Sequence, residues 1–425
     1  MGIDLSYTVE LKCRECGKGY PLELVSTCSQ CFGPLSVAYD YTQIANNVSR
    51  ESIASGPLTL WRYKELLPID NPASIIDIGA GFTPLLKAEN LAEELGLKEC
   101  YIKNDSVNPT FSFKDRPASI AVSKALEFGA PAVGCASTGN LSAAMAAHAS
   151  KARLPCFVFI PQGLEVSKIS QTLAYGAHLI TADGTYDDVN RLATEIAFTS
   201  NIAFANINVR PYYVEGSKTL AFEVCEQLGW QAPDHVIVPV ASGALLHAIW
   251  RGFKELKEVG LIDGWNTRIS AAQPEGCSPI VQALLKSSDE ITPVETPNTI
   301  CKSLAIGDPA DGYYALQAIR ATKGTGRAPN DDEILEGVKL LATTEGIYTE
   351  PAAGVAVATL KQLIEAGEID YDEQVVLYIT GNGLKTQEAI VSGLQRSHKI
   401  TPTIEEFRKL ADKLRTPGVK WLEGA

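Results

Sequence analysis

Short apolar runs alternate with longer amphipathic stretches through most of this chain, from about residue 100 to residue 398. Short continuous apolar runs are typical of strands that are buried on both faces of a sheet. The runs that predict such strands cover residues 155–160, 178–182, 202–205, 236–240 and 375–379.

The stretches between these runs have the apolar periodicity of helices that pack against a sheet. Segment 141–149 is rich in small residues, which suits a helix packed closely against a sheet. Strand–helix–strand order predicts a parallel sheet with helices on both faces, and ligands bind such sheets at the carboxyl ends of the strands. We therefore predict an α/β fold. The predicted helices cover residues 118–128, 141–153, 168–175, 186–198, 216–228 and 244–258.

Three other segments depart from this alternation. Residues 1–40 contain four of the ten cysteines, and residues 41–100 form a connecting region with short helical patterns. Residues 403–414, TIEEFRKLADKL, have the pattern of a capped amphipathic helix. We expect this last helix to pack on the body of the protein or on a second subunit.

The composition narrows the possible classes of protein. With 425 residues, 45% of them hydrophobic, the chain is too long for one core and is expected to form two or three packed domains. No apolar run is long enough for a membrane span, and the N-terminus lacks a secretory pattern. The formal net charge of −13 disfavours nucleic acid and anionic membranes as partners. Six cysteines are scattered singly, as in proteins of a reduced cytoplasm, so we expect a cytoplasmic protein.

The four cysteines at the front form two pairs with the spacing CxxC. Cys13 with Cys16, and Cys28 with Cys31, are separated by eleven residues. Four thiolates from two such knuckles complete a closed tetrahedral zinc site, which is structural because it leaves no open position. Chance pairing of ordinary thiols and a nucleic-acid module are the alternatives, and the mixed charges of the segment show no basic face. We predict structural zinc.

Three loops fall where an α/β sheet presents residues to a ligand. In the first, Lys114 lies beside Phe113 at a helix start, and desolvation there would free a neutral amine for carbonyl chemistry. A solvated surface lysine is the plainer reading. The second loop, 137–140, reads STGN and could bind a carboxylate or phosphate at a helix N-terminus, or only cap the helix. The third, 241–245, reads ASGAL and could cradle a phosphate with its amides, or be an ordinary turn.

Taken together and in this order, the three loops resemble those of the fold-type II family of pyridoxal phosphate (PLP) enzymes, and within it the threonine synthases. The resemblance covers nearly the whole chain, including the cysteine pairs that one branch of threonine synthases carries. SFKDR with a downstream STGN is specific for the wider family, and TGNGLK points to threonine synthase. The motifs are SFKDR around Lys114, STGN ending at Asn140, EGSKT at 215–219, EGI at 345–347, Glu350-Pro351, and TGNGLK at 380–385.

The resemblance implies two open parallel-sheet α/β domains with PLP between them. Residues 41–109 and 211–398 would form the large PLP-binding domain, and residues 110–210 a small domain with Lys114 and the STGN loop. Residues 1–40 would form a zinc-ribbon-like segment and residues 399–425 a helical tail.

The resemblance also implies a role for each loop. Lys114 would form a Schiff base with PLP, Asn140 would donate to the 3′ oxygen of the cofactor, and Thr380 would face its pyridine nitrogen. The substrate carboxylate would be bound by Ser137, Thr138, Gly139 and Asn140. The cofactor phosphate would be bound by Ala241, Ser242, Gly243, Ala244 and Leu245.

Two positions depart from the family pattern. Many relatives have GNxGN in the third loop, whereas this chain has a single glycine there, so backbone amides and the Ser242 hydroxyl would have to replace the lost contacts. Phe111 stands where a glycine is usual, which could reshape the mouth of the site.

The activity implied is that of threonine synthase, which converts O-phosphohomoserine and water into L-threonine and phosphate. An overall charge of −13 means that local cations must meet the substrate phosphate. Lys385 is predicted to be a helix-start or surface charge. The candidates for the phosphate are Arg116, Asn208, Arg210 and Lys218.

Other activities stay open at this point. Cysteate synthase, which uses O-phosphoserine and sulfite, is the nearest alternative, followed by threonine dehydratase, against which TGNGLK speaks. A binding protein that has lost catalysis is the alternative from another class, although the presence of Lys114 argues against it. A homodimer is the assembly implied by the resemblance.

Overall fold

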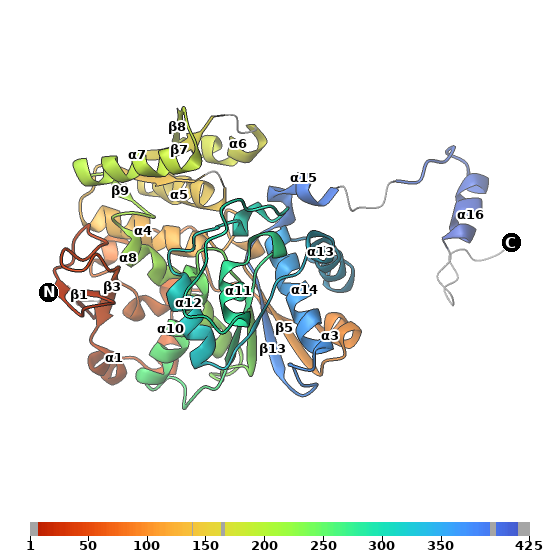
Figure 1. Ribbon diagram of the computed structural model, residues 1–425, viewed down its shortest axis with the longest axis horizontal. Helices are drawn as coiled ribbons and strands as arrows, with labels where there is room; N and C mark the ends of the chain where they lie inside the picture. The colour runs from red at the N-terminus through yellow and green to blue at the C-terminus, as the bar shows by residue number, and fades with distance from the viewer. Residues whose placement is uncertain (1–6, 138, 163–165, 392–396, 415–425) are drawn as a thin grey trace.

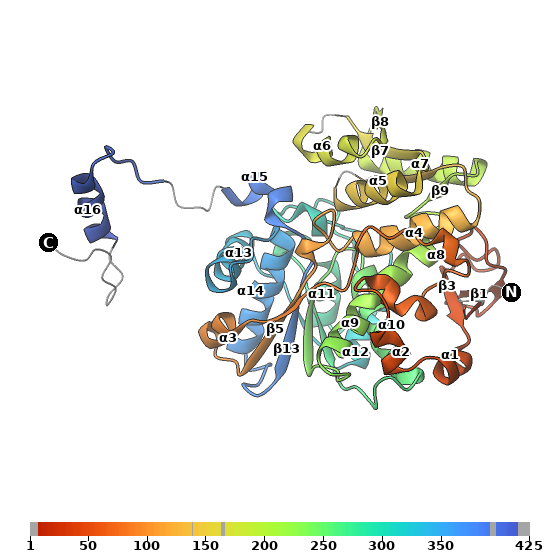
Figure 2. The same cartoon turned by 180° about the vertical axis from the view of Figure 1, so that it is seen from behind.

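The computed structural model describes residues 7–137, 139–162, 166–391 and 397–414. Two parallel sheets with flanking helices form the body, and a small antiparallel sheet lies at its N-terminal end (Figures 1 and 2). Among the residues described, no helix is both long and apolar enough to cross a membrane. The predicted α/β class with parallel sheets is therefore confirmed.

The largest sheet has six strands in the order β12-β11-β10-β13-β5-β4. Neighbouring strands run parallel, except that β4 is antiparallel to β5. The strand predicted at 375–379 lies at the centre of this sheet and is entirely buried. The six strands are β4 (Leu85–Lys87), β5 (Glu99–Asn104), β10 (His235–Pro239), β11 (Arg268–Ala272), β12 (Gly326–Arg327) and β13 (Gln374–Ile379).

Helices from the second half of the chain pack on this sheet. α14 contacts β10 and β13 and packs along α13, whereas α10 packs on α9 and α12. α13 begins at a capping box between Asn330 and Glu333 and ends at Gly346, whose left-handed conformation closes the helix. The helices are α3 (Glu89–Leu95), α9 (Thr219–Gln227), α10 (Ala244–Glu258), α11 (Pro279–Leu285), α12 (Gly312–Ala321), α13 (Asp331–Glu345) and α14 (Pro351–Glu365).

The second parallel sheet has four strands in the order β8-β7-β6-β9. Most of its strands and helices lie within a few residues of the predicted ranges, whereas β6 was not among the predicted strands. The small residues of α5 allow it to pack on β6 and β7, as the sequence predicted, and α5 also contacts α4. These elements are β6 (Val133–Ala136), β7 (Cys156–Pro161), β8 (His178–Ala182), β9 (Ala203–Phe204), α4 (Asp115–Glu127), α5 (Asn140–Ala152), α6 (Val166–Ala174) and α7 (Tyr186–Thr199).

The predicted domain boundaries at residues 110 and 210 fall in the sequence between the strands of the two parallel sheets. The six-stranded sheet uses residues 85–104 and 235–379, and the four-stranded sheet uses residues 133–204. The division into domains itself stays a prediction.

The N-terminal segment forms an antiparallel sheet in the order β2-β1-β3, which we call the ribbon. Leu11, Leu35 and Val37 are buried beneath it. The ribbon contacts α8, which leads into the 3-10 turn η4. The elements here are β1 (Thr8–Cys13), β2 (Gly19–Tyr20), β3 (Leu35–Tyr39), α1 (Tyr41–Asn47), α2 (Arg50–Ala54), α8 (Arg210–Tyr213) and η4 (Val214–Lys218).

The short helix α15 (Gln387–Ile390) precedes the tail, and the tail contains the predicted helix α16 (Ile404–Lys413), which Thr403 caps. Figures 1 and 2 both show α16 apart from the body, with Ile404 and Phe407 exposed. Packing of this helix on the body is therefore not observed, and packing on a second subunit stays a prediction.

Candidate active site

The predicted cofactor residues follow the carboxyl ends of three neighbouring strands of the six-stranded sheet, and these ends form one edge of the sheet. β10, β13 and β5 are neighbours and run parallel, so their carboxyl ends meet. The loop with Lys114 follows β5, Thr380 follows β13, and loop 241–245 follows β10. This edge is where ligands bind in sheets of this class.

Lys114 lies at the start of α4, and the loop before it is fastened to the end of β13. The Phe113 amide donates to the Thr380 carbonyl at 2.9 Å, and Ser112 forms an isolated bridge with Gly381. The Lys114 Nζ donates to the Tyr213 hydroxyl at 3.2 Å and lies 4.6 Å from the centre of the Phe113 ring. The amine is half-buried between two aromatic rings, and it has an oxygen partner.

Asp115 organises the loop that precedes the lysine. Its carboxylate accepts from the Thr110 amide at 2.7 Å, and burial raises the pKa of Asp115 to about 7, although the bonds from Thr110 oppose that rise. Phe111 has a φ of +66°, and its carbonyl accepts from the Asn382 amide at 3.0 Å. The left-handed backbone that usually favours glycine is therefore kept at Phe111 although the residue is not glycine.

The STGN loop opens onto free space at the N-terminus of α5. A side chain at Gly139 would meet no atom within 4 Å, and Asn140 is the first residue of the helix. Ser137 is half-buried, and its hydroxyl accepts from the Gly139 amide at 3.4 Å. Thr138 lies outside the described residues. The first turn of a 13-residue helix, facing open space, suits an anionic group such as a carboxylate.

Glu350 joins this loop to the end of β13, a role that the sequence did not reveal. Its carboxylate accepts from the side-chain Nδ2 of Asn140 at 3.1 Å, and its backbone amide donates to the Gly381 carbonyl at 3.1 Å. Burial raises the pKa of Glu350, although its hydrogen bonds with Asn140 and Thr380 and the charges of Lys385 and Lys114 oppose that rise. A side chain at Gly381 would collide with this carboxylate, so the glycine makes the contact possible. The Glu350-Pro351 motif was the only signal.

The loop after β10 forms an uncapped helix N-terminus. Gly243 has a φ of +92°, and a Cβ there would lie 2.6 Å from the Asp311 carbonyl oxygen, so no other residue fits without a shift. α10 begins at Ala244 without a side-chain cap, so the amides of its first turn can bind an anion. The one glycine of this loop thus stands where the backbone needs it.

These groups fit PLP. A half-buried lysine amine can take up its aldehyde, the start of α10 can bind its phosphate, and Thr380 is buried at the end of the central strand. The fit rests on the uncapped helix start and on the neighbouring strand ends, which lie together on one edge of the sheet.

Two of the four predicted phosphate-binding residues are enclosed in ion pairs. Arg116 is fully buried and donates to Asp105 at 2.6 Å and to Glu223. Lys218 is 1% exposed and pairs with Glu215 and Glu255, each at 2.7 Å. A substrate phosphate would have to displace a carboxylate that is already in place, so the geometry gives both cations a role in the fold.

The other two predicted residues differ from each other. The buried Asn208 side chain accepts from the Phe204 amide at 2.7 Å and donates to the Ile202 carbonyl at 3.0 Å, which fixes the loop after β9. Arg210 has a third of its side chain exposed and pairs with Asp311. The structure does not bring the four residues together at one place.

Lys385 is not the surface charge that the sequence predicted. Its Nζ donates to the Thr110 carbonyl at 2.9 Å and to Gln171 of α6 at 2.8 Å. Burial lowers the pKa of Lys385, although the charges of Glu350 and Asp115 oppose this. Lys385 therefore connects the lysine loop with the helices of the four-stranded sheet.

The four cysteines of the ribbon meet as predicted. Their sulfur atoms all lie within 4.8 Å of one another, with 3.5 Å between Cys13 and Cys31 and 3.6 Å between Cys16 and Cys28. Zinc–sulfur bonds of about 2.3 Å place tetrahedral sulfurs roughly 3.8 Å apart, so the cluster fits a zinc ion. The Tyr20 hydroxyl donates to the Cys28 sulfur at 3.0 Å, which favours a thiolate.

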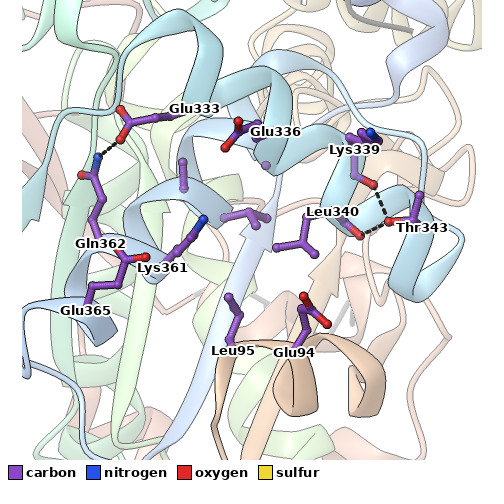
Figure 3. A pocket seen from close by; sticks show the side chains of 13 residues that line it. Glu94, Leu95, Glu333, Glu336, Lys339, Leu340, Thr343, Lys361, Gln362 and Glu365 are labelled. Carbon is purple, nitrogen blue, oxygen red and sulfur yellow. Dashed lines mark hydrogen bonds between the residues drawn. The ribbon is translucent and has the colours of Figure 1, made fainter. Parts of the chain in front are cut away.

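A groove of about 350 Å³ lies between α3, α13 and α14 (Figure 3). Charged side chains such as Glu336 and Lys361 line it together with the apolar Leu95 and Leu340. None of the predicted site residues lines this groove, so the strand-edge site is the better candidate.

Comparison with known proteins shows the family of the chain. Residues 76–381 match the pyridoxal-phosphate dependent enzyme family. The chain is 40% identical to a threonine synthase of Methanocaldococcus jannaschii, over 95% of this chain and 99% of the relative. It is 38% identical to a threonine synthase of Methanosarcina acetivorans, over 94% of this chain and 98% of the relative. Two solved structures share the fold. Maize serine racemase has a TM-score of 0.61 and 20% identity, over 78% of this chain and 94% of that chain. Escherichia coli diaminopropionate ammonia lyase has a TM-score of 0.62 and 20% identity, over 75% of this chain and 89% of that chain.

Proposed function

Because this chain belongs to the pyridoxal-phosphate dependent enzyme family, we propose that it is a threonine synthase, which converts O-phosphohomoserine and water into L-threonine and phosphate. The observation that carries this proposal is the 40% identity to a threonine synthase over nearly the full length of both chains. The positions of Lys114, Asn140 and Thr380 support it.

Four parts of the chain would hold the cofactor. Lys114 would take its aldehyde, the first turn of α10 its phosphate, and Thr380 its ring nitrogen. Asn140, whose amide nitrogen Glu350 orients, would meet the 3′ oxygen. When bound, the cofactor withdraws electrons from the substrate Cα, which makes the neighbouring protons removable.

The residues of the chain would then bind the substrate and move its protons. The start of α5, with Ser137, Gly139 and Asn140, would bind the substrate carboxylate through amides and hydroxyls. Lys114 would move protons at Cα and Cβ, because it lies beside the carboxyl ends of the parallel strands and its Nζ is oriented by the Tyr213 hydroxyl at 3.2 Å. Phosphate would leave from Cγ, a proton would be delivered to Cγ to form the methyl group, and water would add at Cβ.

For the substrate phosphate we retain Arg210, the only one of the three predicted cations whose side chain is more than slightly exposed. Lys385 joins it as a candidate, because its Nζ lies near the lysine loop and Glu350. Arg116, Asn208 and Lys218 would act through the fold.

A direct assay tests the activity. The purified protein, incubated with O-phosphohomoserine, should release phosphate and threonine in equal amounts, and Lys114→Ala should release neither. Borohydride reduction should attach the cofactor to the peptide that contains Lys114. A preference for O-phosphoserine with sulfite would replace this proposal by cysteate synthase, and attachment to another peptide would refute the role of Lys114.

We also propose that the four ribbon cysteines bind one zinc ion, in a structural role. Support comes from the sulfur–sulfur distances and from the lack of an open position in a site of four thiolates. Metal analysis of the purified protein should find about one zinc per chain. A chelator that stops turnover at once without any unfolding would contradict a structural role.

A further inference from the structure

The two residues between Cys13 and Cys16 both contact the start of α12. The Arg14 guanidinium donates to the Asp311 carboxylate at 3.1 Å and lies 4.9 Å from the centre of the Tyr314 ring. The Tyr314 hydroxyl donates to the Glu15 carboxylate. The first metal knuckle is thus fixed to α12 by its own side chains.

Asp311 in turn touches the loop proposed to bind the cofactor phosphate. Its amide donates to the Ser242 carbonyl at 2.9 Å, and its carbonyl lies so close to Gly243 that a Cβ there would be 2.6 Å away. The same carbonyl accepts from the Ala315 amide at 3.0 Å, within α12. A shift of Asp311 therefore shifts the loop that begins α10.

The other carboxylate oxygen of Asp311 binds Arg210, the first residue of α8. α8 ends at Tyr213, whose hydroxyl accepts from the Lys114 Nζ at 3.2 Å. Asp311 is 2% exposed and Arg14 is 11% exposed, so the ion pair between them is largely shielded from solvent. Asp311 consequently connects the ribbon and α8 through its carboxylate, and the phosphate loop through its backbone.

We propose that Arg14 and Asp311 are positioning residues for the cofactor loop, and that metal binding by the ribbon and PLP binding by the body strengthen each other through this pair. The inference rests on the proposed cofactor and zinc sites. A metal bound by Cys13 and Cys16 holds both ends of the segment that carries Arg14, whereas the metal-free knuckle must be ordered before Arg14 can hold Asp311. Coupling of this kind is reciprocal, so PLP raises metal affinity by the same factor.

The first test measures PLP affinity in the metal-loaded protein. PLP is titrated into cofactor-free wild type, Arg14→Gln and Asp311→Asn, and its visible absorbance reports binding independently of turnover. Arg320→Gln is the matched control, because Arg320 lies at the other end of α12 and pairs with Asp289 instead of with the ribbon. We expect the first two variants to bind PLP about tenfold more weakly, and the control to bind as wild type does.

The second test closes a thermodynamic cycle. PLP affinity is measured with and without Zn²⁺ in wild type and in Arg14→Gln, and circular dichroism records whether each form is folded. Metal removal should weaken PLP binding about tenfold in wild type and have little effect in Arg14→Gln, because the connection is already broken.

The outcomes separate this inference from the proposed function. If metal-loaded wild type binds no PLP, the proposed function fails. If wild type binds PLP but Arg14→Gln and Asp311→Asn match Arg320→Gln, the positioning role is refuted. If metal removal has the same effect in wild type and in Arg14→Gln, coupling through Arg14 is refuted. Should the metal-free protein unfold, the comparison of the metal-loaded variants decides.

Discussion

Replacing Arg116 by methionine tests whether this residue holds the fold or the substrate. Its guanidinium donates to Asp105 at 2.6 and 2.8 Å and to Glu223 at 2.8 Å, and Glu223 also pairs with Lys103 at 2.6 Å. All four side chains are buried, and their charges cancel. Methionine preserves much of the length of the side chain but leaves one carboxylate without a cation.

The expected loss of stability is large. Removing one partner of a buried ion pair costs about 3–5 kcal/mol, a considerable part of the roughly 5–15 kcal/mol that stabilises a domain. Burial raises the pKa of Glu223, but the charges of Arg116 and Lys103 outweigh it and bring the pKa to about 2. In wild type the ionised Glu223 therefore stabilises the fold at neutral pH. This stabilisation is lost as the pH falls from the pKa of Glu223 in the unfolded chain toward its folded value of about 2. Without Arg116 the pKa of Glu223 should rise, so the deficit of the variant should shrink in acid.

Urea denaturation followed by tryptophan fluorescence at pH 5 and pH 7.5 measures both effects. Arg320→Met serves as control, because its exposed partner Asp289 makes a pair worth only about 0–1 kcal/mol. The reasoning is refuted if Arg116→Met keeps its unfolding free energy within about 1 kcal/mol of wild type while the KM for O-phosphohomoserine rises. Arg116 would then bind the substrate, as the sequence suggested.

Three further changes test other parts of the structure. Burial raises the pKa of Asp115 to about 7, so the unfolded chain loses this proton at lower pH than the folded chain, and the unfolding free energy should fall as the pH rises from about 4 to about 7. Asp115→Asn should remove this pH dependence from denaturation curves, and an unchanged pH dependence would contradict the assignment. Gly243→Ala should weaken PLP binding much more than Gly229→Ala. Both glycines have a positive φ, but only Gly243 lies against the Asp311 backbone. Equal PLP affinities of the two variants would argue against close packing of the loop after β10. Cys28→Ser should abolish zinc binding and lower the melting temperature, whereas Cys277→Ser, at a buried thiol outside the cluster, should keep its zinc; zinc retained in Cys28→Ser would exclude the four-thiolate site.

The sequence by itself determined the fold class and predicted which residues would react. Buried parallel strands must be apolar throughout, so the run at 375–379 predicted the central strand β13. The spacing of Cys13, Cys16, Cys28 and Cys31 predicted a cluster, because two short knuckles need few other residues to bring four sulfurs together. Lys114 was recognised from its motif and its helix start, both of which are local features.

Only the tertiary structure decided which charged residues are buried in ion pairs. Arg116 and Glu223 are 107 residues apart in the chain, and Arg14 and Asp311 are 297 apart, so no local pattern pairs them. The sequence predicted substrate cations from net charge and motif, but a buried cation must be paired with a carboxylate, and packing selects that partner. Glu350 and Tyr213 were missed for the same reason. Their importance comes from the atoms beside them, Asn140 and Lys114, which only the folded chain brings close.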